Sequence, residues 1–201
     1  MESDLSPIQK HLVLIGGGHT HAIALRLFGL KPGPDVRLTL ISEAADTPYS
    51  GMLPGHVAGF YTHAECHIDL RPLAQFAGAQ FYIDRAIGLD LENNQVICAT
   101  RPPVKFDLLS IDIGSTPKIP DLIGGVNSII PAKPVAKFLN RWHQIVQQVI
   151  QNPASPICLG IVGGGAGGVE LALNMQHHLQ EILKAAGQPP THLTIHLFHR
   201  G

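Results

Sequence analysis

The sequence predicts an α/β protein in which two strand–turn–helix units follow one another along the chain. The 201 residues are 45% hydrophobic and 14% charged, and their 21 glycines and 16 prolines form no low-complexity repeat. This balance is typical of a globular α/β protein. Two apolar runs, Leu12–Ile15 and Ile157–Val162, each lead into a glycine cluster and then into apolar residues at helical spacing.

The first unit begins with the strand Leu12–Ile15 and turns at Gly16-Gly17-Gly18. The helix that follows, HTHAIALRLFGL, is closed by KPGPD, and Val36–Ile41 is the next strand. Together they predict one βαβ unit. Glu43 follows the second strand, where a carboxylate can accept hydrogen bonds from ribose hydroxyls. A solvated acid at a strand end is the alternative.

The middle of the chain contains a long loop and several short strands. Residues 44–70 lose all periodicity, and a loop of that length is usually functional. Short strands are predicted at Gln80–Ile83, Ala86–Leu91 and Gln95–Ala99, and they suggest a small antiparallel meander. A buried strand, Phe106–Ile113, precedes Gly114.

The second unit follows an amphipathic helix at Lys133–Gln151 and the boundary segment NPASP. Its strand Ile157–Val162 leads to a glycine cluster, a helix to about Ala186 and a strand at Leu193–Phe198. Only two strands are predicted here, so we expect an incomplete second fold. The expected domains are residues 1–133, a connecting helix at 134–152, and residues 153–201.

The second glycine cluster reads Gly163-x-Gly165-x-x-Gly168, between a predicted strand and a predicted helix. In the Rossmann-like fingerprint the first glycine permits a tight turn and the second admits a pyrophosphate. The third lets helix and strand pack closely, so that the helix N-terminus faces the anion. A glycine-rich turn without a ligand is the alternative, and a P-loop is excluded because no Gly-Lys-Ser/Thr follows.

The first cluster keeps Gly16 and Gly18 but has His21 in place of the third glycine. Either the helix stands further from the strand, or the imidazole occupies space nearer the nucleotide. His19 lies at the start of the same helix, where its ring can donate a hydrogen bond to a phosphate oxygen.

Charge and targeting signals favour a cytoplasmic protein with a small-molecule partner. The formal net charge is −1 and no basic run is present, which argues against a nucleic-acid partner. The N-terminus lacks the charge pattern of a signal peptide, and no apolar stretch is suited to a transmembrane segment.

Three cysteines are too few and too widely spaced for a disulfide framework or a C-x-x-C motif. Cys98 and Cys158 are predicted to be small buried residues on strands. Cys66 lies between His63 and His67, but two or three ligands of uncertain orientation do not close a coordination sphere, so we predict no metal site.

Taken together, these motifs resemble the pyridine nucleotide-disulfide oxidoreductase superfamily, in the branch of type II NADH dehydrogenases and sulfide:quinone reductases. TPYSGMLPGHVAGFY, from Thr47 to Tyr61, is similar to the flavin-side segment of type II dehydrogenases. GGGHTHAIAL with PYSGMLPG and DIGSTP resembles the flavoprotein module fused ahead of selenophosphate synthetase in some bacteria.

The resemblance implies an FAD/NAD(P)-binding Rossmann-like fold, with FAD on the first unit and NAD(P)H on the second. The flavin would perform the chemistry, so no catalytic side chain is predicted. The cofactor-binding residues implied are Gly16, Gly18, His19, Glu43, Gly114, Gly163, Gly165 and Gly168.

Two positions depart from the superfamily's pattern. Its Ala-Thr-Gly strand end appears as Asp112-Ile113-Gly114. Where NADH-dependent relatives have an acid after the last strand predicted here, this chain has Phe198, His199 and Arg200, and Arg200 could pair with the 2′-phosphate of NADPH.

The function implied is hydride transfer from NAD(P)H to FAD and then to an external acceptor such as a quinone. The alternative is a slow or non-catalytic FAD-binding regulatory module that serves a fused selenophosphate synthetase. We expect the 201-residue chain to be inactive alone, and peripheral association with a membrane stays open.

Overall fold

A computed structural model describes residues 10–116 and 129–200, and the chain divides into two compact units. The first unit comprises Met1–Tyr49 and His67–Gly114, and the second comprises Ser50–Cys66 and Ser115–Gly201. These boundaries differ from the predicted domains. The units are defined by internal contacts, whereas the predicted domains are defined by the nucleotide that each would bind, so the domains stay a prediction.

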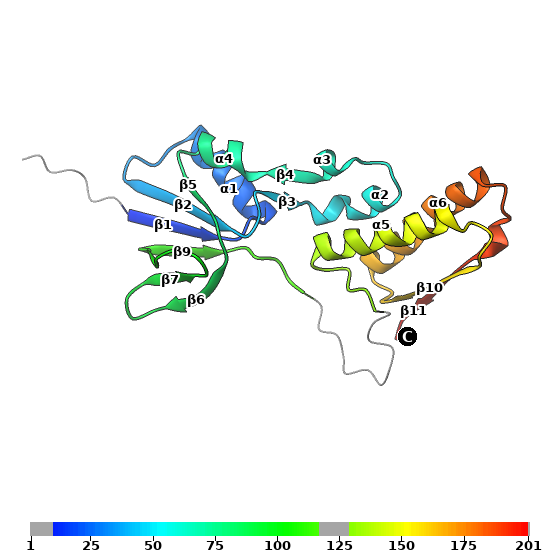
Figure 1. Cartoon of the computed structure of the whole chain (residues 1–201). Helices are drawn as coiled ribbons and strands as arrows, with labels where there is room; N and C mark the ends of the chain where they lie inside the picture. The colour runs from blue at the N-terminus through cyan, green and yellow to red at the C-terminus, as the bar shows by residue number, and fades with distance from the viewer. Residues whose placement is uncertain (1–9, 117–128, 201) are drawn as a thin grey trace, which may run out of the picture. The chain divides into compact units, whose positions relative to one another are not determined.

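The first unit is built on a four-stranded parallel sheet in the order β5-β2-β1-β9 (Figure 1). β1 lies between β2, to which it is joined by a helix, and β9, the last strand of the unit. The core of the sheet includes Val13 and Leu40, both fully buried. The strands are β1 (Lys10–Ile15), β2 (Val36–Ser42), β5 (Gln80–Ile83) and β9 (Leu108–Ile111).

Helix α1 (His19–Leu30) joins β1 to β2, over the residues predicted for it. Its buried side includes Ala22 and the fully buried Leu25. Helix α4 (Leu70–Phe76) leads into β5, and the Asp69 carboxylate caps it by accepting a hydrogen bond from the backbone N–H of Arg71 at 3.0 Å. The βαβ unit predicted at the start of the chain is therefore present.

Residues 44–70 contain short elements and do not form one irregular loop. In the first unit, β3 (Asp46–Pro48) pairs antiparallel with β4 (His67–Asp69). In the second unit, this stretch forms a 3-10 turn at Ser50–Met52 and the helices α2 (Leu53–Val57) and α3 (His63–Cys66). Elements this short show no hydrophobic period, so the sequence pattern missed them.

The antiparallel meander consists of β6 (Ala86–Asp90), β7 (Gln95–Cys98) and β8 (Val104–Lys105). The prediction that Gln80–Ile83 belongs to it is wrong, because this strand, β5, pairs parallel with β2 at the edge of the larger sheet. Cys98 lies on β7 of the meander and is buried, as predicted.

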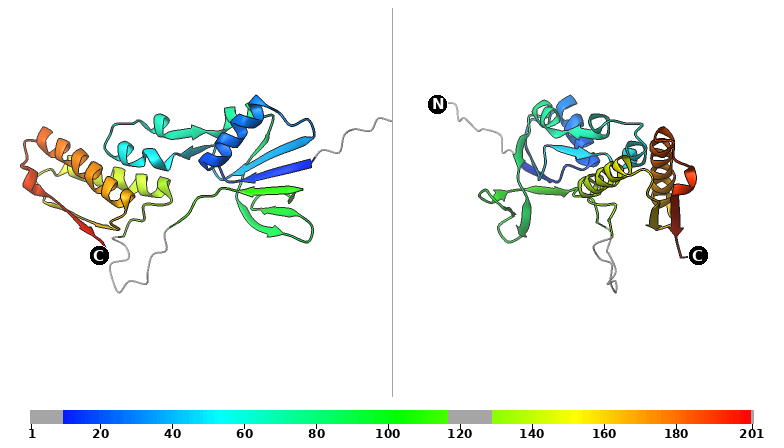
Figure 2. Two further views of the ribbon diagram at one scale, coloured as in Figure 1. Left: turned by 180° about the vertical axis from the view of Figure 1, so that it is seen from behind. Right: turned by 45° about the vertical axis from the view of Figure 1, so that its right-hand side comes forward.

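The second unit packs two long helices against a parallel pair of strands. Helix α5 (Val135–Gln151) and helix α6 (Ala166–Ala185) lie on the same side of β10 (Ile157–Val162) and β11 (Leu193–Phe198) (Figure 2). A short 3-10 turn, Pro190–His192, precedes β11. The core combines residues of α2, α5 and α6, including Leu53, Val57, Phe138, Trp142 and Leu179.

Within the described residues, the helices cover only one face of the β10–β11 pair, because residues of β10 are alternately packed against the core and exposed. Ile157, Leu159 and Ile161 pack against the helical core, whereas Val162 is 88% exposed. Cys158 alternates with the core-facing residues and is exposed, so the prediction that it is buried is wrong. In the described part of the chain, no helix is both long enough and apolar enough to cross a membrane.

Candidate functional site

The first glycine turn connects β1 to α1 at the carboxyl edge of the parallel sheet. The N–H of Gly16 donates to the carbonyl of Ile41 at 2.8 Å, which extends the β1–β2 ladder into the turn. Gly16 has φ +93°, and a Cβ there would overlap the carbonyl oxygen of Asp112. Only glycine fits this position, because both its backbone angle and its closeness to β9 exclude a side chain.

Asp112 connects the end of β9 to both β1 and α1. Its N–H donates to the carbonyl of Ile15 at 2.8 Å, and its carbonyl accepts from Gly18 N–H at 3.1 Å. Its carboxylate oxygen Oδ2 accepts from the backbone N–H groups of Thr20, at 3.0 Å, and His21, at 3.3 Å. The sequence marked Asp112 only as a departure from a motif and did not predict these contacts with α1.

The imidazole of His21 is buried between the glycine turn and β9. Its Nδ1 lies 2.8 Å from the carbonyl oxygen of Gly16, and its Nε2 lies 2.9 Å from the hydroxyl oxygen of Ser110. Because a carbonyl only accepts, Nδ1 donates to Gly16, and in the neutral ring Nε2 accepts from the Ser110 hydroxyl. The ring thus joins the glycine turn to β9 and is buried between them.

His19 is the first residue of α1, and its side chain is exposed. Its ring contacts Tyr49 edge-on, with centroids 5.9 Å apart. The position of His19 at a helix N-terminus is the predicted one, and its contact with a bound anion stays a prediction. Tyr49 was not predicted as a site residue.

Glu43 lies at the carboxyl end of β2, next to Arg85. Its Oε1 is 3.5 Å from Arg85 Nε, and both side chains are largely exposed. Arg85 is brought there because the backbone N–H of Asp84 donates to the carbonyl of Ser42 at 3.0 Å. An exposed ion pair of this kind contributes little to stability, so Glu43 is free to exchange Arg85 for a hydroxyl-bearing ligand.

Gly114 lies beyond the end of β9 at the same edge of the sheet. Its φ is +70°, and no heavy atom lies within 4 Å of the position that a Cβ would occupy. The backbone here is open to a ligand. Pro117, the last residue of the DIGSTP motif, lies outside the described residues.

The second glycine turn lies between strand β10 and helix α6, which is the context that the dinucleotide fingerprint requires. Gly163 N–H donates to the carbonyl of Phe198 at 2.8 Å, so the turn begins at the end of the β10–β11 ladder. A Cβ at Gly168 would overlap the carbonyl oxygen of Gly163, so the third glycine allows the helix to approach the turn. Gly165 is the N-cap of α6, and no heavy atom lies within 4 Å of the position that its Cβ would occupy.

The end of β11 lies beside this second turn. A Cβ at Gly164 would lie 2.7 Å from the Cβ of His199, so His199 covers the middle of the turn. Arg200 follows and is exposed. The structure thus brings the Phe198-His199-Arg200 segment next to the second glycine turn.

The buried thiols are poorly suited to a redox relay. Burial raises the pKa of the Cys66 thiol, and the nearby Glu65 carboxylate raises it further. Burial likewise raises the pKa of Cys98. Because the thiolate is the reactive form, both groups are weak nucleophiles at neutral pH.

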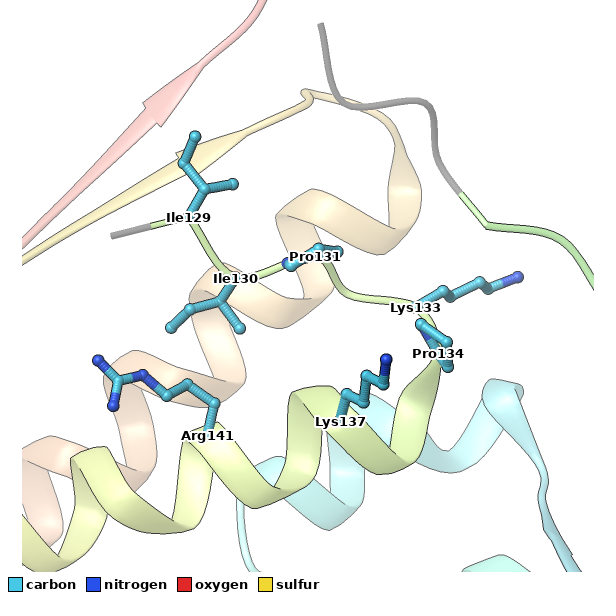
Figure 3. Close-up of a pocket in the computed structure, with 7 residues that line it drawn as sticks. All are labelled: Ile129, Ile130, Pro131, Lys133, Pro134, Lys137 and Arg141. Atoms are coloured by element: carbon cyan, nitrogen blue, oxygen red, sulfur yellow. The ribbon is translucent and has the colours of Figure 1, made fainter. Parts of the chain in front are cut away.

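A cavity of about 190 Å³ lies at the start of α5 in the second unit (Figure 3). Ligand pockets usually measure about 300–1,000 Å³, so this cavity is small for a dinucleotide. It shares no residue with either glycine turn. Its lining is Ile129, Ile130, Pro131, Lys133, Pro134, Lys137 and Arg141.

Comparisons with known proteins find similar sequences and similar structures, although no family model matches the chain. The chain is 30% identical over 159 residues to the sulfide-quinone reductase of Aquifex aeolicus, covering 77% of this chain and 35% of that protein. The structure of the sulfide:quinone oxidoreductase from A. aeolicus matches with a TM-score of 0.68 at 24% identity, covering 94% of this chain and 43% of that one. The structure of NDH2 from Plasmodium falciparum in complex with NADH matches with a TM-score of 0.76 at 16% identity, covering 94% and 41%.

These matches confirm the predicted fold class, a mixed α/β fold like that of FAD- and NAD(P)-binding oxidoreductases. Membership of the pyridine nucleotide-disulfide oxidoreductase superfamily stays a prediction, because the sequence match covers 35% of the relative and the two structural matches are only 24% and 16% identical. The chain spans 35% of the curated relative and less than half of either structure.

Proposed function

We propose that this chain supplies the FAD-binding fold, and the first part of the NAD(P)H-binding fold, of a flavin-dependent oxidoreductase. The observation on which the proposal depends is that both glycine turns lie between the end of a parallel strand and the start of a helix. This is where α/β folds bind dinucleotide phosphates. The similarity to a sulfide-quinone reductase supports the same kind of activity.

In the first fold, Gly16 and Gly18 leave room for the pyrophosphate of FAD, and His19 can donate to one of its oxygens. Glu43 accepts hydrogen bonds from the adenosine ribose at the neighbouring strand end, as parallel strands ending at one edge of a sheet allow. Gly114 offers exposed backbone beside the turn.

In the second fold, Gly163, Gly165 and Gly168 form the corresponding cradle for NAD(P)H. The open space around Gly165 is where a pyrophosphate can approach the backbone. Arg200 is exposed at the end of β11 and can pair with a 2′-phosphate, which favours NADPH over NADH.

Bound FAD would supply the electron transfer itself, by accepting hydride from NAD(P)H and passing electrons to a quinone or another external acceptor. The residues of this chain bind and orient the two nucleotides. The alternative, a regulatory module serving a fused selenophosphate synthetase, receives no support from the relatives described above.

The absorbance spectrum of the purified full-length protein tests this proposal, because we expect the 201 residues alone to be inactive. Flavin bands should be present, should bleach with NADPH or NADH without oxygen, and should return when a quinone is added. Gly165→Val should abolish bleaching and leave bound flavin intact, because the Cβ added there meets no protein atom within 4 Å while the valine side chain fills the approach of the nicotinamide dinucleotide. Equal loss of flavin and of bleaching would show that the two folds have been confused, and a protein that takes up no flavin would refute the proposal.

A further inference from the structure

The N-terminus of α1 already holds an anion that belongs to the chain itself. The Asp112 carboxylate accepts hydrogen bonds from the backbone N–H groups of Thr20 and His21, the second and third residues of the helix. These are N–H groups without a partner inside the helix, and such groups are the ones that a bound phosphate uses. β9 delivers Asp112 to this position because it lies next to β1 in the sheet (Figure 1).

The fit between the carboxylate and the turn is close. A Cβ at Gly18 would overlap the Asp112 carboxyl group, so the absence of a side chain at Gly18 makes room for it. The glycine that leaves space for a pyrophosphate therefore leaves space for Asp112 as well. Both anions would draw on the same partial positive charge of the helix N-terminus.

We propose that Asp112 competes with the dinucleotide phosphate for the N-terminus of α1 and thereby sets the affinity of the first fold for phosphate-bearing ligands. The proposal rests on the proposed function, which assigns FAD to this turn. A phosphate that binds the N–H groups of Thr20 and His21 must displace the carboxylate. Once displaced, the carboxylate stays tethered to β9 and repels the phosphate, because two negative charges then share one site.

Removal of the charge should strengthen binding only for ligands that bear a phosphate. Asp112→Asn keeps an oxygen that can accept from Thr20 and His21, so the helix stays capped while the negative charge is lost. We expect this variant to bind FAD and ADP about tenfold more tightly than the unchanged protein, the factor that corresponds to one charge-assisted hydrogen bond. Adenosine, which has no phosphate, should bind with unchanged affinity.

Isothermal titration with FAD, ADP and adenosine measures these affinities. Asp107→Asn is the matched control: Asp107 lies at the opposite end of β9, and its Oδ2 accepts from the backbone N–H of His11 at 2.7 Å. It should change none of the three affinities. Asp112→Ala removes both charge and cap, so it should also bind ADP more tightly while it unfolds at a lower temperature.

The outcomes separate this inference from the proposed function. If the unchanged protein binds FAD and Asp112→Asn, still folded, binds it no more tightly, Asp112 is only a helix cap and the inference is wrong. If only the variant binds FAD, the competition is supported and the role of the native chain in flavin binding is refuted. If neither binds FAD or ADP, both ideas fail. An equal change for adenosine and ADP also overturns the inference.

Discussion

The Nε2 atom of His21 lies 2.9 Å from the hydroxyl oxygen of Ser110, and this contact joins the start of α1 to β9. On the other side of the ring, Nδ1 donates to the carbonyl of Gly16. The imidazole is almost fully buried, so both hydrogen bonds are shielded from water. His21 thus replaces the close helix–strand contact of the usual glycine with a polar bridge between three segments.

Replacement of His21 by the glycine of the common fingerprint should therefore destabilise the protein. We expect His21→Gly to lower the free energy of unfolding by about 2–4 kcal/mol, because it leaves a cavity, two unpaired polar groups and a glycine in the first turn of a helix. Denaturant titration followed by circular dichroism measures this change. A variant as stable as the original would mean that the buried bridge has no net effect.

The matched test of the bridge is a double-mutant cycle with Ser110→Ala. The coupling energy of His21 and Ser110 should be about 1 kcal/mol, since removal of either partner leaves the other without its hydrogen bond. Strict additivity of the two substitutions would contradict the contact.

The helices and strands that could be predicted are those with a clear hydrophobic pattern next to glycines or prolines. Helix α1 and strands β10 and β11 have the predicted boundaries. β5 did not join the predicted meander, because a four-residue strand contains no signal for its partner. Burial of Cys158 was wrong because the helices cover only the other face of β10 in the described part of the chain.

Some residues of the candidate site could likewise be predicted from local sequence, and others could not. The glycine turns and Glu43 follow from local spacing, because each lies directly after a strand. Asp112, Ser110 and Arg85 could not be placed, since their neighbours in the site come from segments distant in sequence. They meet only once the strand order β5-β2-β1-β9 is known. A polar residue at the end of a strand that neighbours β1 is the signal that could have identified Asp112.

Glu43→Ala should weaken FAD binding without affecting folding. The expected loss is about 1–3 kcal/mol, the cost of leaving ribose hydroxyls without their acceptor. Stability should hardly change, because Glu43 and its ion-pair partner Arg85 are both exposed. Fluorescence titration of the apoprotein with FAD gives the affinity. Glu92→Ala, at an exposed position of the meander turn, is the control, and equal FAD affinity in both variants would refute the role of Glu43.

Two neighbouring glycines of α6 should respond in opposite ways to the same substitution. Gly168→Ala should destabilise the protein, because the new Cβ overlaps the carbonyl oxygen of Gly163. Gly167→Ala places its Cβ in open space and should stabilise the helix by about 0.5–1 kcal/mol. Thermal unfolding of the two variants gives the comparison. Equal effects would mean that α6 does not approach the turn as closely as the structure shows.

Asp84 should make the stability of the first unit depend on pH. Its side chain is buried, and burial alone would raise its pKa, but hydrogen bonds from the backbone N–H groups of Arg85 and Thr100 and the charge of Arg101 hold the pKa below its usual range. A carboxyl group whose pKa is lower in the folded state stabilises that state above the unfolded pKa of about 3.9. This stabilisation is lost as the pH falls through the lower, folded pKa.

Asp84→Asn should accordingly lower the melting temperature most at pH 7, and the difference from the unchanged protein should shrink as the pH falls below about 4. Melting curves between pH 2 and 8, chosen to span roughly both pKa values, measure the difference. Asp35→Asn removes an exposed carboxylate of the first unit and should leave the curve nearly unchanged. If the deficit of Asp84→Asn were the same at every pH, the ionised carboxylate would not be the stabilising group, and the contacts of Arg85, Thr100 and Arg101 would have to act through packing alone.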